Sequence, residues 1–178
     1  GIIGIASNKP VSMNIINSLK RLEYRGYDSA GLATLTNSAI NEKKCSGRVE
    51  ELEKILFKTP SNGDIGIGHV RWVTHGIPSI VNAHPHSSEI VSVVHNGIIE
   101  NSDEIKKNLE AKGIKFKSQT DTEVITLLIT EALKVKQPLD SVFSTLKKLK
   151  GSFALGIIFK DYKDIIIGAR RGSPLAVG

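Results

Sequence analysis

The sequence predicts one globular domain of the mixed α/β class, in which helices cover layers of sheet. Its 178 residues, 40% of them hydrophobic, suit a single packed core. Apolar residues recur at helical spacing in some segments and form short uninterrupted runs in others. Because these runs are apolar almost throughout rather than alternating, they are typical of sheets covered on both faces.

The first half of the chain predicts two helices and three strands. In order, these are a helix over 11–22, a strand over 31–35, a helix over 49–57, and strands over 65–72 and 90–95. Gly26 supplies a helix stop after the first helix. The stretch between the last two strands contains glycine, asparagine and two prolines, which predicts an ordered loop.

The second half predicts three helices followed by two strands. Two helix starts match the capping-box spacing, at Asn101 with Glu104 and at Thr120 with Glu123. A third helix over 139–149 precedes strands over 152–159 and 164–169. No segment reads as a linker or a repeat, so we expect one domain over residues 1–178.

Charge and composition argue against two classes of partner. The net charge of +6 comes from lysines spread over several segments, and the nine aromatic residues do not alternate with them, so we expect no nucleic acid. The apolar runs are much shorter than the roughly 20 residues of a membrane span, so we expect no membrane. A single cysteine and no visible secretion signal favour the cytoplasm.

Neither the cysteine nor the histidines establish a site by themselves. Cys45 lies in a charged stretch that reads as a loop, and we assign it no role. The five histidines, which are His69, His75, His84, His86 and His95, fall in one region without a metal-binding spacing. We therefore predict no metal and no cofactor, and a core imidazole is the commoner reading for the two histidines in predicted strands.

Four segments are rich in polar residues where packing alone would not require them. They are residues 22–31 (LEYRGYDSAG), 69–76 (HVRWVTHG), 94–101 (VHNGIIEN) and 120–123 (TDTE). Each has an ordinary explanation when taken alone: Asn96-Gly97 is a turn signal, and Asp121 favours a helix N-terminus.

Together and in this order, these segments resemble the class II glutamine amidotransferases, in the branch that aminates a sugar phosphate. Residues 81–86 (VNAHPH) and 172–175 (GSPL) extend the resemblance over essentially the whole chain. It implies an α+β fold of the N-terminal nucleophile hydrolase type, a four-layer αββα sandwich of two antiparallel sheets between helices. It further implies hydrolysis of glutamine to supply ammonia to fructose 6-phosphate, in a homo-oligomeric enzyme with a separate sugar isomerase domain.

The resemblance also implies roles for particular residues. Arg71 would pair with the α-carboxylate of glutamine, and Asp121 would take its α-ammonium group. Thr74 and His75 would add contacts around the carboxylate, and Trp72 would gate the ammonia passage, although a core tryptophan is an equal reading.

The catalytic groups implied by the resemblance lie at the chain start and in one strand. The Asn96 side chain and the Gly97 backbone N–H would form the oxyanion hole. The nucleophile would be a cysteine immediately before Gly1, with its own α-amine as general base. Arg25 would support it, or serve a structural role. That cysteine is not written, so we expect the chain as given not to hydrolyse glutamine and the family's domain to continue past Gly178.

Two other functions remain open from the sequence. The chain could be a glutamine-binding or interaction module that has lost its nucleophile and kept its pocket. It could also be a class II amidotransferase that supplies a different acceptor, because a glutamine pocket carries no information about the acceptor.

Overall fold

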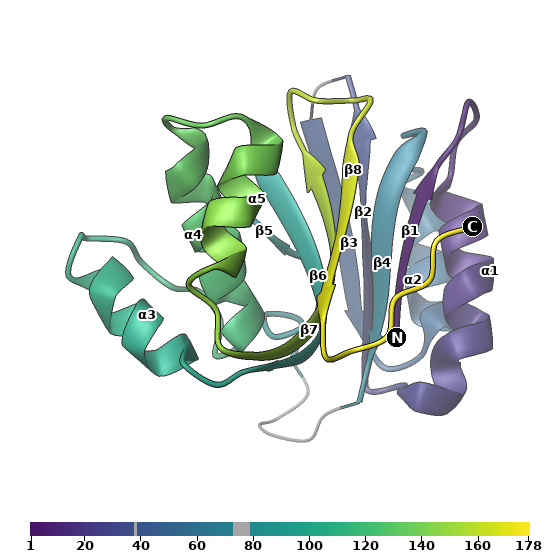
Figure 1. The fold of residues 1–178 in the computed structure, drawn as a ribbon. Helices are drawn as coiled ribbons and strands as arrows, with labels where there is room; N and C mark the ends of the chain where they lie inside the picture. Colours follow the sequence, from purple (N-terminus) through teal and green to yellow (C-terminus); the bar gives the residue numbers. More distant parts are fainter. Residues whose placement is uncertain (38, 73–78) are drawn as a thin grey trace.

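The computed structural model describes residues 1–37, 39–72 and 79–178, which form two antiparallel sheets stacked between two layers of helices (Figure 1). The strands are β1 (Ile2–Ala6), β2 (Ser29–Thr36), β3 (Ala39–Ser46), β4 (Ile65–Arg71), β5 (His86–Ser87), β6 (Val91–Ile99), β7 (Gly151–Phe159) and β8 (Ile166–Arg171). The helices are α1 (Ser12–Leu22), α2 (Val49–Lys58), α3 (Ser102–Glu110), α4 (Asp121–Leu133) and α5 (Pro138–Leu146), with a 3₁₀ turn at Glu23–Arg25. This arrangement is the predicted αββα sandwich.

The first sheet has the strand order β1-β4-β2-β3, and all its neighbours are antiparallel. Its register pairs Ile2 with His69 and Ser29 with Arg71, so the start of β1 and the end of β4 lie at the same edge. Every residue of β2 but the last is buried. A central strand packed on both faces explains the apolar run in the sequence.

The second sheet has the order β5-β6-β7-β8, also antiparallel throughout. Helices α3, α4 and α5 cover its outer face, while α1 and α2 cover the outer face of the first sheet (Figure 1). A third apolar cluster, which includes Ile67, Val94 and Ile158, joins the two sheets. Burial of one such side chain contributes about 1.5–3 kcal/mol to the stability of the fold. Because this cluster includes residues of β4 and β6, it holds these two strands against each other.

Three strands were missed by the sequence analysis, and each is short or at an edge. β3 is an edge strand whose polar and charged residues, such as Lys43 and Lys44, read as a loop. The neighbouring strand β2 provides most of the buried apolar side chains here, so β3 can form with few apolar residues of its own. β5 has two residues, and β1 was not recognised as a strand.

The predicted helix starts are correct, but the predicted caps are wrong. α3 follows Asn101, whose side chain does not cap the helix. Its amide group donates to the backbone carbonyl of Lys148 and accepts from the backbone N–H of Lys150. α4 follows Thr120, and the carboxylate of Glu123 accepts hydrogen bonds from the backbone of Lys117 and Ser118. Asn101 and Glu123 thus bind the backbone of residues 148–150 and 117–118, respectively, to the first turn of a helix. Within the residues described, no helix has the length and apolar character needed to cross a membrane.

Candidate functional site

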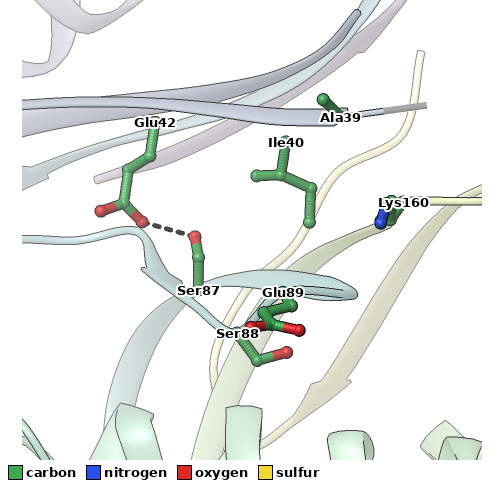
Figure 2. Close-up of a pocket in the computed structure, with 7 residues that line it drawn as sticks. All are labelled: Ala39, Ile40, Glu42, Ser87, Ser88, Glu89 and Lys160. Atoms are coloured by element: carbon green, nitrogen blue, oxygen red, sulfur yellow. Dashed lines mark hydrogen bonds between the residues drawn. The ribbon is translucent and has the colours of Figure 1, made fainter. Parts of the chain in front are cut away.

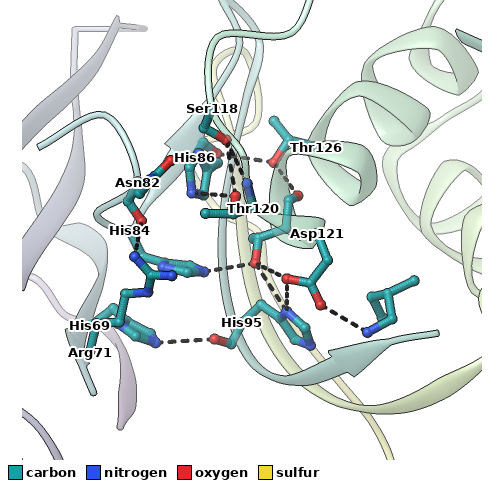
Figure 3. A network of polar contacts seen from close by, with 12 residues as sticks. His69, Arg71, Asn82, His84, His86, His95, Ser118, Thr120, Asp121 and Thr126 are labelled. Atoms are coloured by element: carbon teal, nitrogen blue, oxygen red, sulfur yellow. Dashed lines mark hydrogen bonds and ion pairs between the residues drawn. The ribbon is translucent and has the colours of Figure 1, made fainter. Parts of the chain in front are cut away.

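Four of the predicted site residues, Arg71, Asn96, Gly97 and Asp121, lie at one end of the sandwich, where β4, β6 and α4 meet. Arg71 is the last residue of β4, Asn96 and Gly97 lie in β6, and Asp121 is the first residue of α4. Burial lowers the pKa of the Arg71 guanidinium, and the negative charge of Asp121, followed by that of Asp28, partly offsets this effect. A half-buried cation and a carboxylate therefore share this end of the molecule (Figure 3).

Asp121 is held by the strand that carries Asn96 and Gly97. Its Oδ2 accepts a 2.8 Å hydrogen bond from the Ile99 backbone N–H, and its Oδ1 lies 3.8 Å from His95 Nδ1. Both contacts come from β6, so the first turn of α4 and this strand form one unit.

Asn96 and Gly97 lie within a strand and do not form a turn. They pair with Ala154 and Phe153 of β7. Gly97 has φ +138°, and a Cβ placed on it would lie 2.1 Å from the carbonyl oxygen of Ser152. The turn explanation for this dipeptide is therefore wrong, and glycine is required because the neighbouring backbone passes so close.

The start of the chain lies beside the same site. Gly1 exchanges two backbone hydrogen bonds with Val70, of 2.7 and 2.9 Å. Continued by one position, the antiparallel register would set the residue before Gly1 opposite Arg71. Burial lowers the pKa of the Gly1 α-amine to about 6, and the positive charge of Arg25 adds to this effect. An amine in this environment is mostly unprotonated at neutral pH.

Four buried histidines fill the space behind the site (Figure 3). The rings of His69 and His84 stack with centroids 4.2 Å apart, and the His86 ring meets His84 at 4.9 Å. Burial lowers the pKa of all four, well below the usual value for His69 and His84 and to about 3 for His86. The cluster is therefore neutral at physiological pH.

Hydroxyl and carbonyl groups bind one nitrogen of each of these rings. His84 Nε2 and His95 Nδ1 lie 2.7 and 3.0 Å from Thr122 Oγ1. His69 Nε2 lies 3.1 Å from the His95 carbonyl oxygen, and His86 Nε2 lies 2.8 Å from the hydroxyl of Thr120. In the described ranges, no group of three or more histidine, cysteine or acidic side chains is arranged to hold a metal ion.

The chain's sequence matches a known domain family over more than half its length. The model of the glutamine amidotransferase domain matches residues 76–173. The chain belongs to the glutamine amidotransferase domain family. This agrees with the resemblance carried by its four polar segments.

Within this family, the chain is similar to curated proteins of one kind. Proteins named glutamine–fructose-6-phosphate aminotransferase (isomerizing) are 49% identical in Bradyrhizobium diazoefficiens and 51% identical in Brucella abortus, each over 179 aligned positions that include this whole chain. The chain spans about 29% and 30% of those two proteins. The family domain is thus a minor part of each relative's length.

Solved structures share the fold. The glutamine phosphoribosylpyrophosphate amidotransferase of B. subtilis, complexed with ADP and GMP, superposes with a TM-score of 0.79 at 26% identity, over 89% of this chain and 35% of that one. A class-II glutamine aminotransferase domain protein from Silicibacter pomeroyi gives a TM-score of 0.67 at 13% identity, over 97% and 77% of the two chains. The second is a likeness of fold alone.

Other predicted residues of this amidotransferase domain have mixed outcomes. Trp72 is 56% exposed and meets the Tyr27 ring edge-on at 5.8 Å, so the core reading is wrong. Arg25 is exposed, and its Nε donates to the hydroxyl of Tyr24. Thr74 and His75 lie outside the described residues.

Cys45 is a buried residue of β3 instead of a loop residue. Its Sγ lies 3.6 Å from the Arg48 carbonyl oxygen, and burial raises the pKa of the thiol. The neighbouring lysines therefore do not convert it to a thiolate. These contacts agree with a packing role.

A surface cavity of about 370 Å³ lies at the far end of the first sheet (Figure 2). It is lined by Ala39, Ile40, Glu42, Ser87, Ser88, Glu89 and Lys160. Ala39 pairs with Thr36 at one end of β2, whereas Arg71 pairs with Ser29 at the other. The cavity is therefore separate from the predicted site, and it contains none of the predicted residues.

Proposed function

We propose that this domain hydrolyses the side-chain amide of glutamine and that the longer protein uses the ammonia to convert fructose 6-phosphate to glucosamine 6-phosphate. The observation that carries the first part is that Arg71 and Asp121, whose opposite charges act on each other, lie at the same end of the sandwich as the β6 segment Asn96-Gly97 and the chain start. The relatives, about 50% identical across the whole chain, support the second part.

The two charges suit a free amino acid. Arg71 takes the α-carboxylate of glutamine through two parallel N–H donors, and Asp121 takes the α-ammonium group. Thr74 and His75 complete the carboxylate contacts, and exposed Trp72 borders the path of the ammonia. A zwitterionic ligand satisfies both charges at once, which a simple amide does not.

The chemistry requires a nucleophile and a place for negative charge. A cysteine directly before Gly1 attacks the side-chain amide carbon while its α-amine accepts the thiol proton. The Asn96 amide and the Gly97 N–H stabilise the tetrahedral oxyanion. The C–N bond then breaks, ammonia leaves with the transferred proton, and water hydrolyses the thioester to release glutamate.

The register of β1 with β4 supports this place for the nucleophile, because it would set a residue before Gly1 opposite Arg71. In the longer protein, residues 1–178 are the amidotransferase domain, a sugar isomerase domain follows, and the enzyme is a cytoplasmic homo-oligomer that needs no cofactor.

The test compares full-length proteins with cysteine or alanine directly before Gly1. Only the cysteine form should release glutamate from glutamine, and with fructose 6-phosphate it should yield glucosamine 6-phosphate. Glutamine binding without hydrolysis in both forms would establish a binding module instead. Glutamate release without the amino sugar would point to a different acceptor.

A further inference from the structure

The hydroxyl of Thr122 is the centre of a buried hydrogen-bond network behind Asp121. It lies 2.7 Å from His84 Nε2, 3.0 Å from His95 Nδ1 and 3.5 Å from Asp121 Oδ1. Thr122 is fully buried, and both rings are buried as well. A hydroxyl has one proton to donate and two lone pairs, so three contacts use all of its capacity.

The direction of each bond follows from the ring nitrogens that lack a partner. By hydrogen-bond geometry, in the part of the chain that the structure describes, these buried atoms are His69 Nδ1, His84 Nδ1 and His95 Nε2; the Ser152 backbone also acts on the His95 ring, but it does not meet that geometry. A neutral imidazole carries one N–H, and leaving that donor unpaired in the interior costs about 1–3 kcal/mol. The proton on each ring therefore lies on the partnered nitrogen.

This assignment determines the role of the threonine proton. His69 donates from Nε2 to a carbonyl oxygen, which can only accept. His84 Nε2–H and His95 Nδ1–H both donate to Thr122 Oγ1. The threonine proton is then directed at Asp121 Oδ1, and the Ile99 N–H occupies Oδ2.

We infer that Thr122, with His84 and His95 behind it, is a positioning residue for glutamine: it fixes the Asp121 carboxylate where that carboxylate meets the substrate α-ammonium group. The inference rests on the proposed function for the identity of the ligand. The network reaches Asp121 from β6 and from the segment that carries His84 (Figure 3), and the Asp121 side chain keeps 28% of its surface exposed.

The chain offers a matched set of variants. Thr122→Val keeps the shape and removes the hydroxyl, while Thr122→Ser keeps the hydroxyl. Thr126→Val removes an equally buried hydroxyl one turn later in α4, where it bonds only the backbone carbonyls of His86 and Thr122. Thr126→Val therefore controls for the loss of a buried hydroxyl from this part of α4.

The assay is glutamine hydrolysis by full-length protein with a free cysteine before Gly1. Thr122→Val should raise KM for glutamine about tenfold with kcat within about twofold, because the contact to the α-ammonium is made equally in ground and transition states. Thr122→Ser and Thr126→Val should stay within about twofold of the parent in both constants.

A substrate analogue without the amino group distinguishes a loss of Asp121 positioning from a general disturbance of the glutamine pocket. The inhibition constant of 4-carbamoylbutanoate, which is glutamine without its amino group, should not change in Thr122→Val. An equal rise for glutamine and the analogue, or equal behaviour of Thr122→Val and Thr126→Val, would overturn the inference. An inactive parent protein would instead contradict the proposed function.

A measurement on the unmutated protein tests the network even if Thr122→Val does not fold. With ¹⁵N-labelled histidine, His69 and His84 should be neutral with the proton on Nε2, and His95 neutral with the proton on Nδ1. A proton on His84 Nδ1 or on His95 Nε2 would mean that Thr122 donates to that ring and not to Asp121, and either result would refute the inference.

Discussion

The neutral state of His86 makes the stability of this domain dependent on pH. Burial, followed by the charges of Lys44, Arg71 and His95, lowers its pKa from 6.5 to about 3. Between these two values the unfolded chain binds a proton that the folded chain does not, so the free energy of unfolding falls as pH falls below 6.5. From pH 7.5 to 5.5 the expected loss from His86 alone is about 1.4 kcal/mol.

The assay is urea unfolding at both pH values and constant ionic strength, for the parent protein and for His86→Gln. The glutamine side chain can still reach the Thr120 hydroxyl, but it does not titrate. Other groups that titrate in this window are present in both proteins and cancel in the comparison. The parent should lose about 1.4 kcal/mol more than the variant over the interval. Equal losses would mean that His86 has the same pKa in the folded and the unfolded chain, which would refute the reasoning.

Three further predictions concern other parts of the domain. Asp121→Asn should raise KM for glutamine roughly 30- to 1,000-fold, since it leaves a buried charge contact of about 2–4 kcal/mol unmade; an unchanged KM in steady-state kinetics would contradict this. Gly97→Ala should lower the free energy of unfolding by about 2–4 kcal/mol in urea, because its Cβ would lie 2.1 Å from a backbone oxygen; parent-like stability would show that β6 and β7 can separate locally. Cys45 should react with a thiol reagent at pH 8 at least about tenfold more slowly in the folded protein than in urea, and equal rates would disprove its burial.

The sequence was sufficient to predict the central strands and the amphipathic helices, because their apolar patterns are local. β2 and β7 are apolar runs, and α1 and α2 have an apolar stripe. It was insufficient for β3, whose partner supplies most of the apolar contact, and for the caps of α3 and α4. Asn101 and Glu123 match the capping-box spacing, yet each is used by a segment that only the fold brings near.

The site shows the same division between local and long-range information. The motif residues can be recognised from the sequence because they stand in polar segments. The sequence of these segments does not indicate which distant residues contact them in the fold. Thr122 lies in the polar segment 120–123, but the sequence does not indicate its role, because its partners are 38 and 27 positions away. His69 and His95 meet only because β4 and β6 belong to different sheets that pack face to face. The polar interior behind Asp121 therefore depends on how the two sheets and α4 pack together, and in such an interior a threonine can hold a carboxylate more firmly than a surface residue can.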